Sequence, residues 1–468
     1  MKQSLVLVCL LLTSTVMLAE NEKKVRRVAK PVPGEYIVLL EKNVDPQSVA
    51  AELGRRHGVK IQFVWEHALK GFSFIVNLQN GAKVASEAAD ARVKVVEENA
   101  ITELDLSAQQ NLPSGDAGFW GLDRLDNIKL PWSSSRESGT YVYTNSGLNV
   151  PIYIVDTGVR GDHTEFGSRV STGYNAMTEF QPNHDFYDPW PANNPCGVMP
   201  GTQPVTVPVD GPAGTRTFNP GYSTFHEFNN GHGTAVASIA AGSTYGAAKQ
   251  ASIIPVKVFD CDQNGGTATS LLNGLNWIAG NHNGSAGVVN MSVFYLGGAP
   301  AGSGLTCDAA NDEGQGGAID AAVDTLVYFK NLVVTASANN GNVDARCTVP
   351  ARTGAAITVG GAMRNNTRLN IDAVVSNFGP AIDFFAPAET IASAHLSSIW
   401  ARRTNGTSGT SFASPLAAGC AARYRQTYPS INAENATTDI IYATIPNIMT
   451  GDIGAGSLNR YLHCPTNW

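Results

Sequence analysis

The 468-residue sequence is poor in charge: only 15% of its residues are Asp, Glu, Lys or Arg, and no long basic run occurs. With a formal net charge of −7, the chain lacks the positive surface that binding to nucleic acid or to an anionic membrane needs, so we expect neither as a partner. After the N-terminus, no segment approaches the roughly eighteen consecutive apolar residues of a membrane span. What remains is an ordinary globular balance, with 43% hydrophobic residues.

The N-terminus is typical of a secretory signal peptide. Lys2 supplies a positive start, Leu5 to Met17 is largely apolar, and small or polar residues follow from Ala19. The alternative is a membrane anchor, for which this apolar run is short. We therefore predict a signal peptide over residues 1–19 and a secreted, extracellular protein.

The sequence contains seven cysteines, of which Cys9 lies in the predicted signal peptide. An even number of cysteines in a secreted chain indicates disulfides, but six cysteines allow 15 pairings and the sequence does not choose among them. Cys420 lies on a predicted buried helix, where a free thiol is equally compatible. The six remaining cysteines are Cys196, Cys261, Cys307, Cys347, Cys420 and Cys464.

Residues 32–104 have the pattern of a small α+β module, in which two strands and a helix recur. The stretch after it, residues 105–118, is polar and contains glycine, which is typical of a processing linker. The predicted elements are strands at Tyr36–Leu40, Phe72–Leu78 and Val93–Val96, and helices at Gln47–His57 and Ala82–Ala91.

Residues 119–468 alternate apolar runs with helical patterns. Most of the runs are apolar on both faces, which predicts a mostly parallel sheet flanked by helices, an α/β fold. Residues 178–230 are rich in Pro, Asn and aromatic residues without periodicity, and we expect a surface insertion there. The predicted strands are Val150–Val155, Ile253–Phe259, Val288–Val293, Leu332–Ala336 and Ile357–Gly361.

Three short motifs carry candidate catalytic residues. Asp156 ends an apolar strand in Ile154–Val159, His232 stands between two glycines in Asn230–Ala237, and Ser411 opens a small-residue helix in Asn405–Pro415. Taken singly, the aspartate and the serine are more simply helix caps, and the histidine is more simply a structural group.

The three motifs together predict nucleophilic catalysis. A serine hydroxyl needs an adjacent base, and that base needs a carboxylate to orient it. The chain order Asp156, His232, Ser411 matches the order in subtilisin. It differs from the Ser, Asp, His order of lipases and esterases. Ser411 at a helix N-terminus is placed to stabilise negative charge, and Pro415 is expected in the first turn of that helix, where no N–H is needed.

These motifs resemble the signatures of subtilisin-like serine peptidases, and the sequence is nearest to the proteinase K-like branch. Asp-Thr-Gly at 156–158, His-Gly-Thr at 232–234 and Gly-Thr-Ser at 409–411 each match, and Val32–Val38 resembles the start of the family's inhibitory propeptide. The resemblance implies a three-layer subtilisin-like peptidase domain over residues 119–468, behind a propeptide at 32–104. It also implies a zymogen that cuts itself between Glu103 and Gln110.

The resemblance implies further site residues. Asn340 takes the oxyanion position together with the Ser411 backbone N–H, and Asn339 stands where the family has glycine. Substrate should add as a strand along two segments. In the first, Phe294 replaces a glycine; either it narrows the cleft, or the segment is an insertion after which Leu296-Gly297 restores the family pattern. Ala235 and Phe412 also depart from the family pattern without removing a catalytic atom. The implied substrate-binding residues are Ser292, Val293, Phe294, Ala336, Ser337 and Ala338.

No cofactor is expected for the chemistry, but a structural calcium ion is implied at Asp383 with the carbonyls of Gly354 and Ala356. An exposed turn aspartate is the alternative. Glycosylation sequons occur at Asn283, Asn365, Asn405 and Asn435, whereas the sequon at Asn290 lies in a predicted buried strand and should stay unmodified.

The sequence therefore predicts a secreted, monomeric serine endopeptidase that acts on proteins or peptides and is inhibited by its own propeptide. The rival function is a catalytically weak or inactive member of the same fold that holds peptides, which Phe294 and Asn339 favour and the complete triad opposes. A lipase or esterase is a third hypothesis, disfavoured by the motif order.

Overall fold

The computed structural model describes most of the two predicted domains. The predicted signal peptide, the predicted linker, most of the 178–230 stretch, Cys196, Cys261, Cys307 and the Asn405 sequon lie outside the described residues. The described residues are 24–76, 88–104, 119–126, 141–176, 205–208, 215–218, 231–259, 266–296, 317–395 and 407–468.

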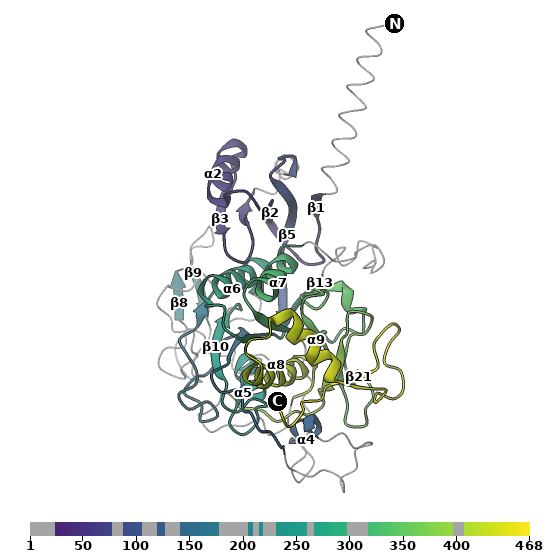
Figure 1. Cartoon of the computed structure of the whole chain (residues 1–468). Coiled ribbons are helices and arrows are strands. Elements are labelled where there is room, and N and C mark those ends of the chain that lie inside the picture. Colours follow the sequence, from purple (N-terminus) through teal and green to yellow (C-terminus); the bar gives the residue numbers. More distant parts are fainter. Residues whose placement is uncertain are drawn as a thin grey trace, which may run out of the picture.

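In its described residues, the N-terminal module is a twisted, mostly antiparallel sheet with helix α2 packed on it (Figure 1). Strand β2 lies between β4 and β5, β3 forms the far edge, and the short β1 pairs in parallel with β5. The sequence missed β3, whose residues are mostly half-buried and do not alternate. The elements are β1 (Val25–Arg26), β2 (Pro31–Leu40), α2 (Pro46–His57), β3 (Lys60–Trp65), β4 (Gly71–Ile75) and β5 (Val93–Leu104).

The two faces of this small sheet belong to different cores. Val38 and Leu40 pack with Leu53 of α2 in a core of the module itself. Ile37 and Leu39, which alternate with them along β2, belong instead to the large core of the rest of the chain. Because side chains alternate along a strand, one face of the module is closed by its own helix and the other by the following domain.

The larger domain is built on a sheet in the order β20-β21-β19-β16-β14-β12-β6-β10-β7. Its pairs are parallel except for β20 with β21. The strands are β6 (Pro151–Asp156), β7 (Tyr174–Asn175), β10 (Ser252–Lys257), β12 (Gly287–Met291), β14 (Leu332–Ser337), β16 (Ile357–Ala362), β19 (Phe384–Pro387), β20 (Ile445–Pro446) and β21 (Arg460–Tyr461).

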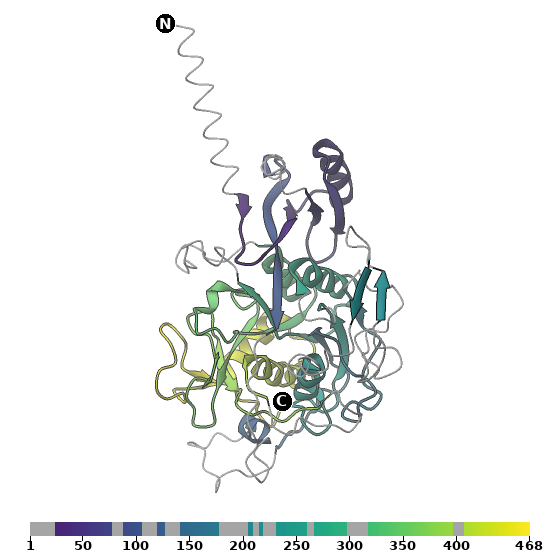
Figure 2. The same cartoon turned by 180° about the vertical axis from the view of Figure 1, so that it is seen from behind.

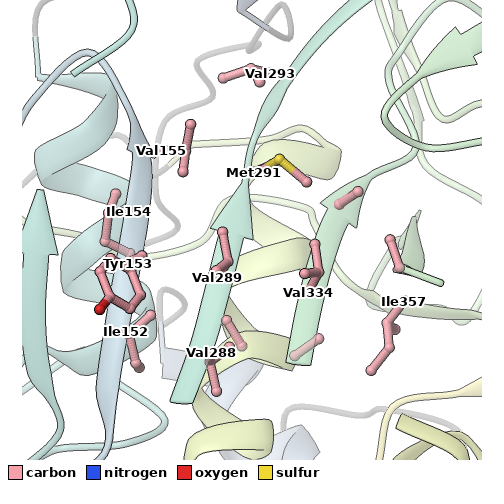
Figure 3. Close-up of a cluster of buried hydrophobic side chains, with 14 of the residues drawn as sticks. Ile152, Tyr153, Ile154, Val155, Val288, Val289, Met291, Val293, Val334 and Ile357 are labelled. Carbon is pink, nitrogen blue, oxygen red and sulfur yellow. The ribbon is translucent and has the colours of Figure 1, made fainter. Parts of the chain in front are cut away.

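Apolar side chains on both faces of the central strands explain the burial of this sheet. Residues of β6, β12 and β14 form a continuous layer of Ile, Val and Met side chains (Figure 3). The predicted run Val288–Val293 divides at Ser292 into β12 and the short β13 (Val293–Leu296), which leaves the main sheet. The smaller strands are β8 (Val205–Pro208), β9 (Thr215–Phe218), β11 (Gly266–Thr267), β15 (Thr348–Val349), β17 (Asn370–Ile371) and β18 (Val374–Val375).

Helices cover the main sheet, which confirms the predicted α/β class. Helix α8 packs on β12, β14, β16 and β19 with α5 beside it, while α6 and α7 lie under the N-terminal module (Figure 1). Within the described ranges, none of the helices has the length and apolar character that crossing a bilayer requires. The helices are α4 (Trp120–Asp126), α5 (His232–Ala241), α6 (Ala268–Asn281), α7 (Ala318–Tyr328), α8 (Thr410–Thr427) and α9 (Ala433–Ala443).

Candidate active site

Asp156 is the last residue of β6 and is fully buried. One oxygen of its carboxylate accepts a hydrogen bond from the backbone N–H of Thr157 at 2.7 Å. Both oxygens lie 2.9 Å from Nδ1 of His232. The strand end therefore presents a fixed carboxylate to the imidazole ring, which favours the tautomer with the proton on Nδ1.

His232 is the first residue of α5, directly after Gly231, whose φ of 93° is a left-handed value suited to glycine. Gly233 is required by close packing, because a Cβ there would lie 2.1 Å from the carbonyl oxygen of Gly158. The Nε2 atom of His232 is buried and has no hydrogen-bond partner among the described residues. The ring thus has one nitrogen held by a carboxylate and the other available to accept a proton.

Ser411 lies in the first turn of α8, whose N-cap is Gly409. The neighbouring Phe412 packs against the ring of His232, with 5.6 Å between ring centroids, so the start of α8 lies against the histidine. The hydroxyl of Ser411 points to the carbonyl oxygen of Ser292 at 3.5 Å, a long contact. All three predicted triad side chains are therefore buried around the meeting point of β6, α5 and α8.

Asn340 follows β14 and is buried beside the start of α8. Its side-chain oxygen accepts a hydrogen bond from the N–H of Thr410 at 3.0 Å, which fixes the amide next to Ser411. Asn339 has a φ of 76°, a value at which glycine is favoured and asparagine is tolerated. The turn expected from glycine in the family therefore forms here with asparagine.

The predicted substrate edge is occupied by the end of the N-terminal module. Strand β13 pairs antiparallel with β5, with Val293 opposite Leu104 and Phe294 opposite Glu103. On the other side, Gly266 and Thr267 of β11 pair with Thr102 and Ile101. Strand β5 extends from the module into the larger domain (Figure 2), so an extended segment is accepted at this edge despite Phe294.

The second predicted substrate segment, Ala336, Ser337 and Ala338, runs from the end of β14 into the turn before Asn340. All three residues are fully buried. Ala336 pairs with Met291 of β12 and Ser337 with Val359 of β16, so this segment forms part of the main sheet.

The expectation that Pro415 lies in the first turn of its helix is wrong. Helix α8 begins at Thr410, so Pro415 is inside it. A proline at this position cannot donate to the carbonyl of Ser411 four residues earlier. That carbonyl instead accepts a hydrogen bond from the hydroxyl of Ser292 at 2.9 Å. Sequence reasoning missed this bond, although the four-residue spacing between serine and proline signals the missing helical donor.

Asp383 lies just before β19 and accepts a hydrogen bond from the N–H of Thr358 at 2.8 Å, next to the 354–356 segment. Burial raises the pKa of this carboxyl group to about 7, and no cationic side chain offsets the effect. A carboxylate oxygen is a ligand type that suits Ca²⁺, and Asp383 would supply one such oxygen. The described residues contain no cluster of three or more Asp, Glu, His or Cys side chains that could hold a metal ion.

The cysteines divide into two kinds. Cys347 forms a disulfide, whereas Cys420 and Cys464 are buried free thiols that form a hydrogen bond with each other. The even count therefore does not mean that every cysteine is paired. Asn290 is fully buried in β12, as expected, while the sequons at Asn283, Asn365 and Asn435 are exposed.

A parallel sheet with the aspartate at a strand end and the histidine and serine at the starts of two covering helices is typical of a class of protein, the serine peptidases of the α/β type. Comparison with known proteins agrees with this class, since the model of the subtilase family matches residues 147–459. The chain belongs to the subtilase family, and it is a serine-type endopeptidase whose substrates are proteins.

Similar proteins come from bacteria and fungi. An extracellular serine proteinase of a Thermus strain is 32% identical over 93% of this chain and 90% of its own length. Alkaline protease 1 of Emericella nidulans is 30% identical over 84% of this chain and 82% of its own length. These matches span both the N-terminal module and the larger domain.

Solved structures support the fold. A cold-adapted subtilisin-like serine proteinase is similar over 75% of this chain and 99% of its own, with a TM-score of 0.52 and 28% identity. Fervidolysin from Fervidobacterium pennivorans covers 93% of this chain and 62% of its own at a TM-score of 0.58, and at 17% identity it supports the fold alone. Subtilases need no cofactor for catalysis.

Proposed function

We propose that this protein hydrolyses peptide bonds with Ser411 as nucleophile, His232 as general base and Asp156 as the group that orients the histidine. The observation that carries the proposal is the buried bond between Asp156 and Nδ1 of His232, which leaves Nε2 without a partner beside the helix of Ser411. The same arrangement argues against a protein that only holds peptides, for which an oriented base has no use.

The proposed mechanism follows from the hydrogen bonds of His232 and Asn340. Ser411 Oγ attacks the peptide carbonyl while Nε2 of His232 takes its proton, and the imidazolium is stabilised by Asp156. The tetrahedral intermediate develops negative charge on the carbonyl oxygen. Asn340, with its side-chain oxygen held by Thr410 N–H, offers its amide N–H to that charge together with the Ser411 backbone N–H. His232 then protonates the leaving amine as the C–N bond breaks, and water, deprotonated by His232, hydrolyses the acyl ester and returns the proton to Ser411 Oγ.

The assignment is tested by labelling with a fluorophosphonate that reacts with activated serines. We expect the label on Ser411 in the wild-type chain and none in His232→Ala or Ser411→Ala. Asn340→Leu should keep the label site but lower kcat by about 10²–10³, the usual effect of losing one oxyanion donor. Equal labelling of wild type and the His232→Ala variant would contradict the proposal.

We also propose that residues 32–104 are an inhibitory propeptide, that the chain is secreted behind a signal peptide over residues 1–19, and that the mature enzyme is a monomer. Support for inhibition comes from β5, whose last residues fill the edge between β11 and β13 where a substrate strand would bind. Release then requires a cut after this strand, between Glu103 and Gln110. Secretion is supported by the extracellular Thermus relative.

Asp383 is proposed to bind a structural calcium ion together with the carbonyls of Gly354 and Ala356. The support is its desolvated carboxylate, which lacks a cationic side chain. Calcium there would stabilise the turn between residues 350 and 358 without entering the reaction. The ion would neutralise the buried charge, so its binding should be stronger above the raised pKa of Asp383.

A further inference from the structure

The carbonyl of Ser411 depends on a side chain from another element for its hydrogen bond. Pro415 lacks the N–H that would donate to it within α8. The hydroxyl of Ser292, at the start of the substrate edge, donates to this carbonyl at 2.9 Å. Both residues are fully buried, so water does not substitute for the missing helical donor.

The side chain of Asn290 orients the hydroxyl of Ser292 through a hydrogen bond. Asn290 Nδ2 donates to Ser292 Oγ at 3.1 Å, which leaves the hydroxyl proton of Ser292 directed at the Ser411 carbonyl. On its other side, Asn290 Oδ1 accepts from the hydroxyl of Ser414 at 2.8 Å and from that of Thr335 at 3.1 Å. Asn290, Ser292, Ser414 and Thr335 are all fully buried, and we name them the Asn290 network.

The Asn290 network joins strands β12 and β14 to helix α8, which carries Ser411. Asn290 lies in β12, Thr335 in β14, Ser414 in the first turns of α8, and Ser292 immediately before β13. Only an amide presents a donor and an acceptor in this fixed geometry, because a carboxylate accepts only and a hydroxyl carries one proton. The network therefore sets both the position of the Ser411 backbone and the start of the substrate strand.

We propose that Asn290 is a positioning residue for Ser411, acting through Ser292 and Ser414 and touching neither substrate nor the reacting atoms. The inference rests on the proposed role of Ser411 and deepens it. In this arrangement the main sheet, rather than α8 alone, sets the distance between the serine and His232. Small displacements of a nucleophile are costly, since near-attack geometry requires reacting atoms about 3–3.5 Å apart.

The first test compares three single variants with a matched control. Asn290→Asp keeps the acceptor but loses the donor, so Ser292 would donate to the new carboxylate and abandon the Ser411 carbonyl. Ser414→Ala and Thr335→Val each remove one bond to Oδ1. The control is Tyr153→Phe in β6, which removes a buried hydrogen bond of 3.0 Å to His282 at the C-cap of α6, outside the Asn290 network.

The measured quantities are kcat and KM on a peptide substrate, per active site counted by fluorophosphonate labelling, together with the melting temperature. We expect kcat to fall at least tenfold for Asn290→Asp and severalfold for Ser414→Ala and Thr335→Val, with KM nearly unchanged. Thr335→Ser, which keeps the hydroxyl, should restore kcat. Tyr153→Phe should lower the melting temperature about as much as the network variants do, because it also removes one buried hydrogen bond. It should leave kcat at the wild-type value.

A second test uses the missing helical donor. Ser292→Ala should lower kcat by leaving the Ser411 carbonyl unpaired, whereas Pro415→Ala supplies an N–H to that carbonyl. The double variant should therefore lose less kcat than Ser292→Ala does alone. This test does not require Asn290→Asp to fold.

Wild-type kcat in Ser414→Ala and Thr335→Val, or a kcat loss in Tyr153→Phe equal to theirs, would overturn the positioning role. So would a kcat in the Ser292→Ala and Pro415→Ala double variant no higher than in Ser292→Ala. Failure of the proposed function looks different, because the wild-type chain would then carry no label on Ser411. Labelled wild type with unaffected network variants would remove only this inference.

Discussion

The N-terminal module and the peptidase domain bury their sheets in different ways. The peptidase sheet is apolar on both faces and is covered by its own helices (Figure 3). Helix α2 packs on one face of the module's sheet, and the other face, which includes Ile37 and Leu39, packs into the core of the peptidase domain. The module therefore completes its burial only against the peptidase domain, whereas the peptidase sheet is covered by its own helices.

Polar contacts between the two regions follow the same pattern. Trp65 donates from its indole nitrogen to Asn273 of α6 at 2.7 Å, and Asn99 accepts from the N–H of Thr269 in the first turn of α6 at 3.0 Å. Glu97 lies at the start of α7, where it accepts from the N–H of Ala318 at 3.4 Å. Module side chains thus satisfy backbone donors that the N-termini of peptidase helices leave unpaired.

The largest effect expected is on the rate of peptide hydrolysis, because the proposed catalytic residues all lie in the peptidase domain. Ser411→Ala should lower turnover by about 10⁶, as in triad knockouts of this type, and should leave the precursor uncut. Gel analysis of the purified chain and peptide hydrolysis measure both. Normal self-processing by this variant would show that the chemistry lies elsewhere.

The next effect concerns the dependence of the module on its partner. Residues 24–104 expressed alone should show little stable structure, because the face carrying Ile37 and Trp65 is exposed without the peptidase domain. Circular dichroism should report folding when mature peptidase labelled at its serine is added. A fully folded isolated module would remove the distinction between the two regions.

A pH effect is expected at the interface itself. Burial raises the pKa of Glu97, whose charged neighbours are Arg352, Arg26 and Asp320. A carboxyl with a raised pKa in the complex favours docking below its ordinary pKa, and this contribution is lost as pH rises through the raised value. The module should therefore inhibit more weakly as pH increases. Inhibition constants measured across pH give the slope.

The control for this pH effect is Glu97→Gln, which is neutral at every pH. Its inhibition should vary less with pH than that of the wild-type module. If both modules show the same slope, Glu97 is not the titrating group.

The smallest effect is expected in the peptidase domain at Asp383. Its pKa of about 7 means that, without a bound cation, stability is lost as pH rises through that value. Calcium should therefore raise the melting temperature of the wild-type protein by a few degrees above pH 7 and less below it. Asp383→Asn should show no such calcium response, and an unchanged response would place any calcium elsewhere.

The sequence predicted the elements whose pattern is local. Both-face apolar runs located β6, β12 and β14, and the spacing of Gln47–His57 located α2. Strand β3 could not be predicted, because its residues are mostly half-buried and do not alternate. The division of the β12 run at Ser292 also escaped, because the sequence does not tell where a strand leaves its sheet.

For the candidate site, motifs were enough to select Asp156, His232 and Ser411, but not the bonds that hold them. The sequence indicates Asn290 only as a sequon residue in a buried strand. Its partners Thr335 and Ser414 are 45 and 124 residues away in the chain, and only the folded sheet brings them together. Such long-range polar contacts leave no periodic trace in a sequence.

The alternation along β2 has a consequence for how this precursor can vary. Neighbouring residues of this strand belong to different cores. A change at Val38 therefore alters the stability of the module, whereas a change at Ile37 alters how tightly the module binds the peptidase domain. On the proposal that the module inhibits the enzyme, substitutions one position apart would change the lifetime of the inhibited form and the folding of the module independently.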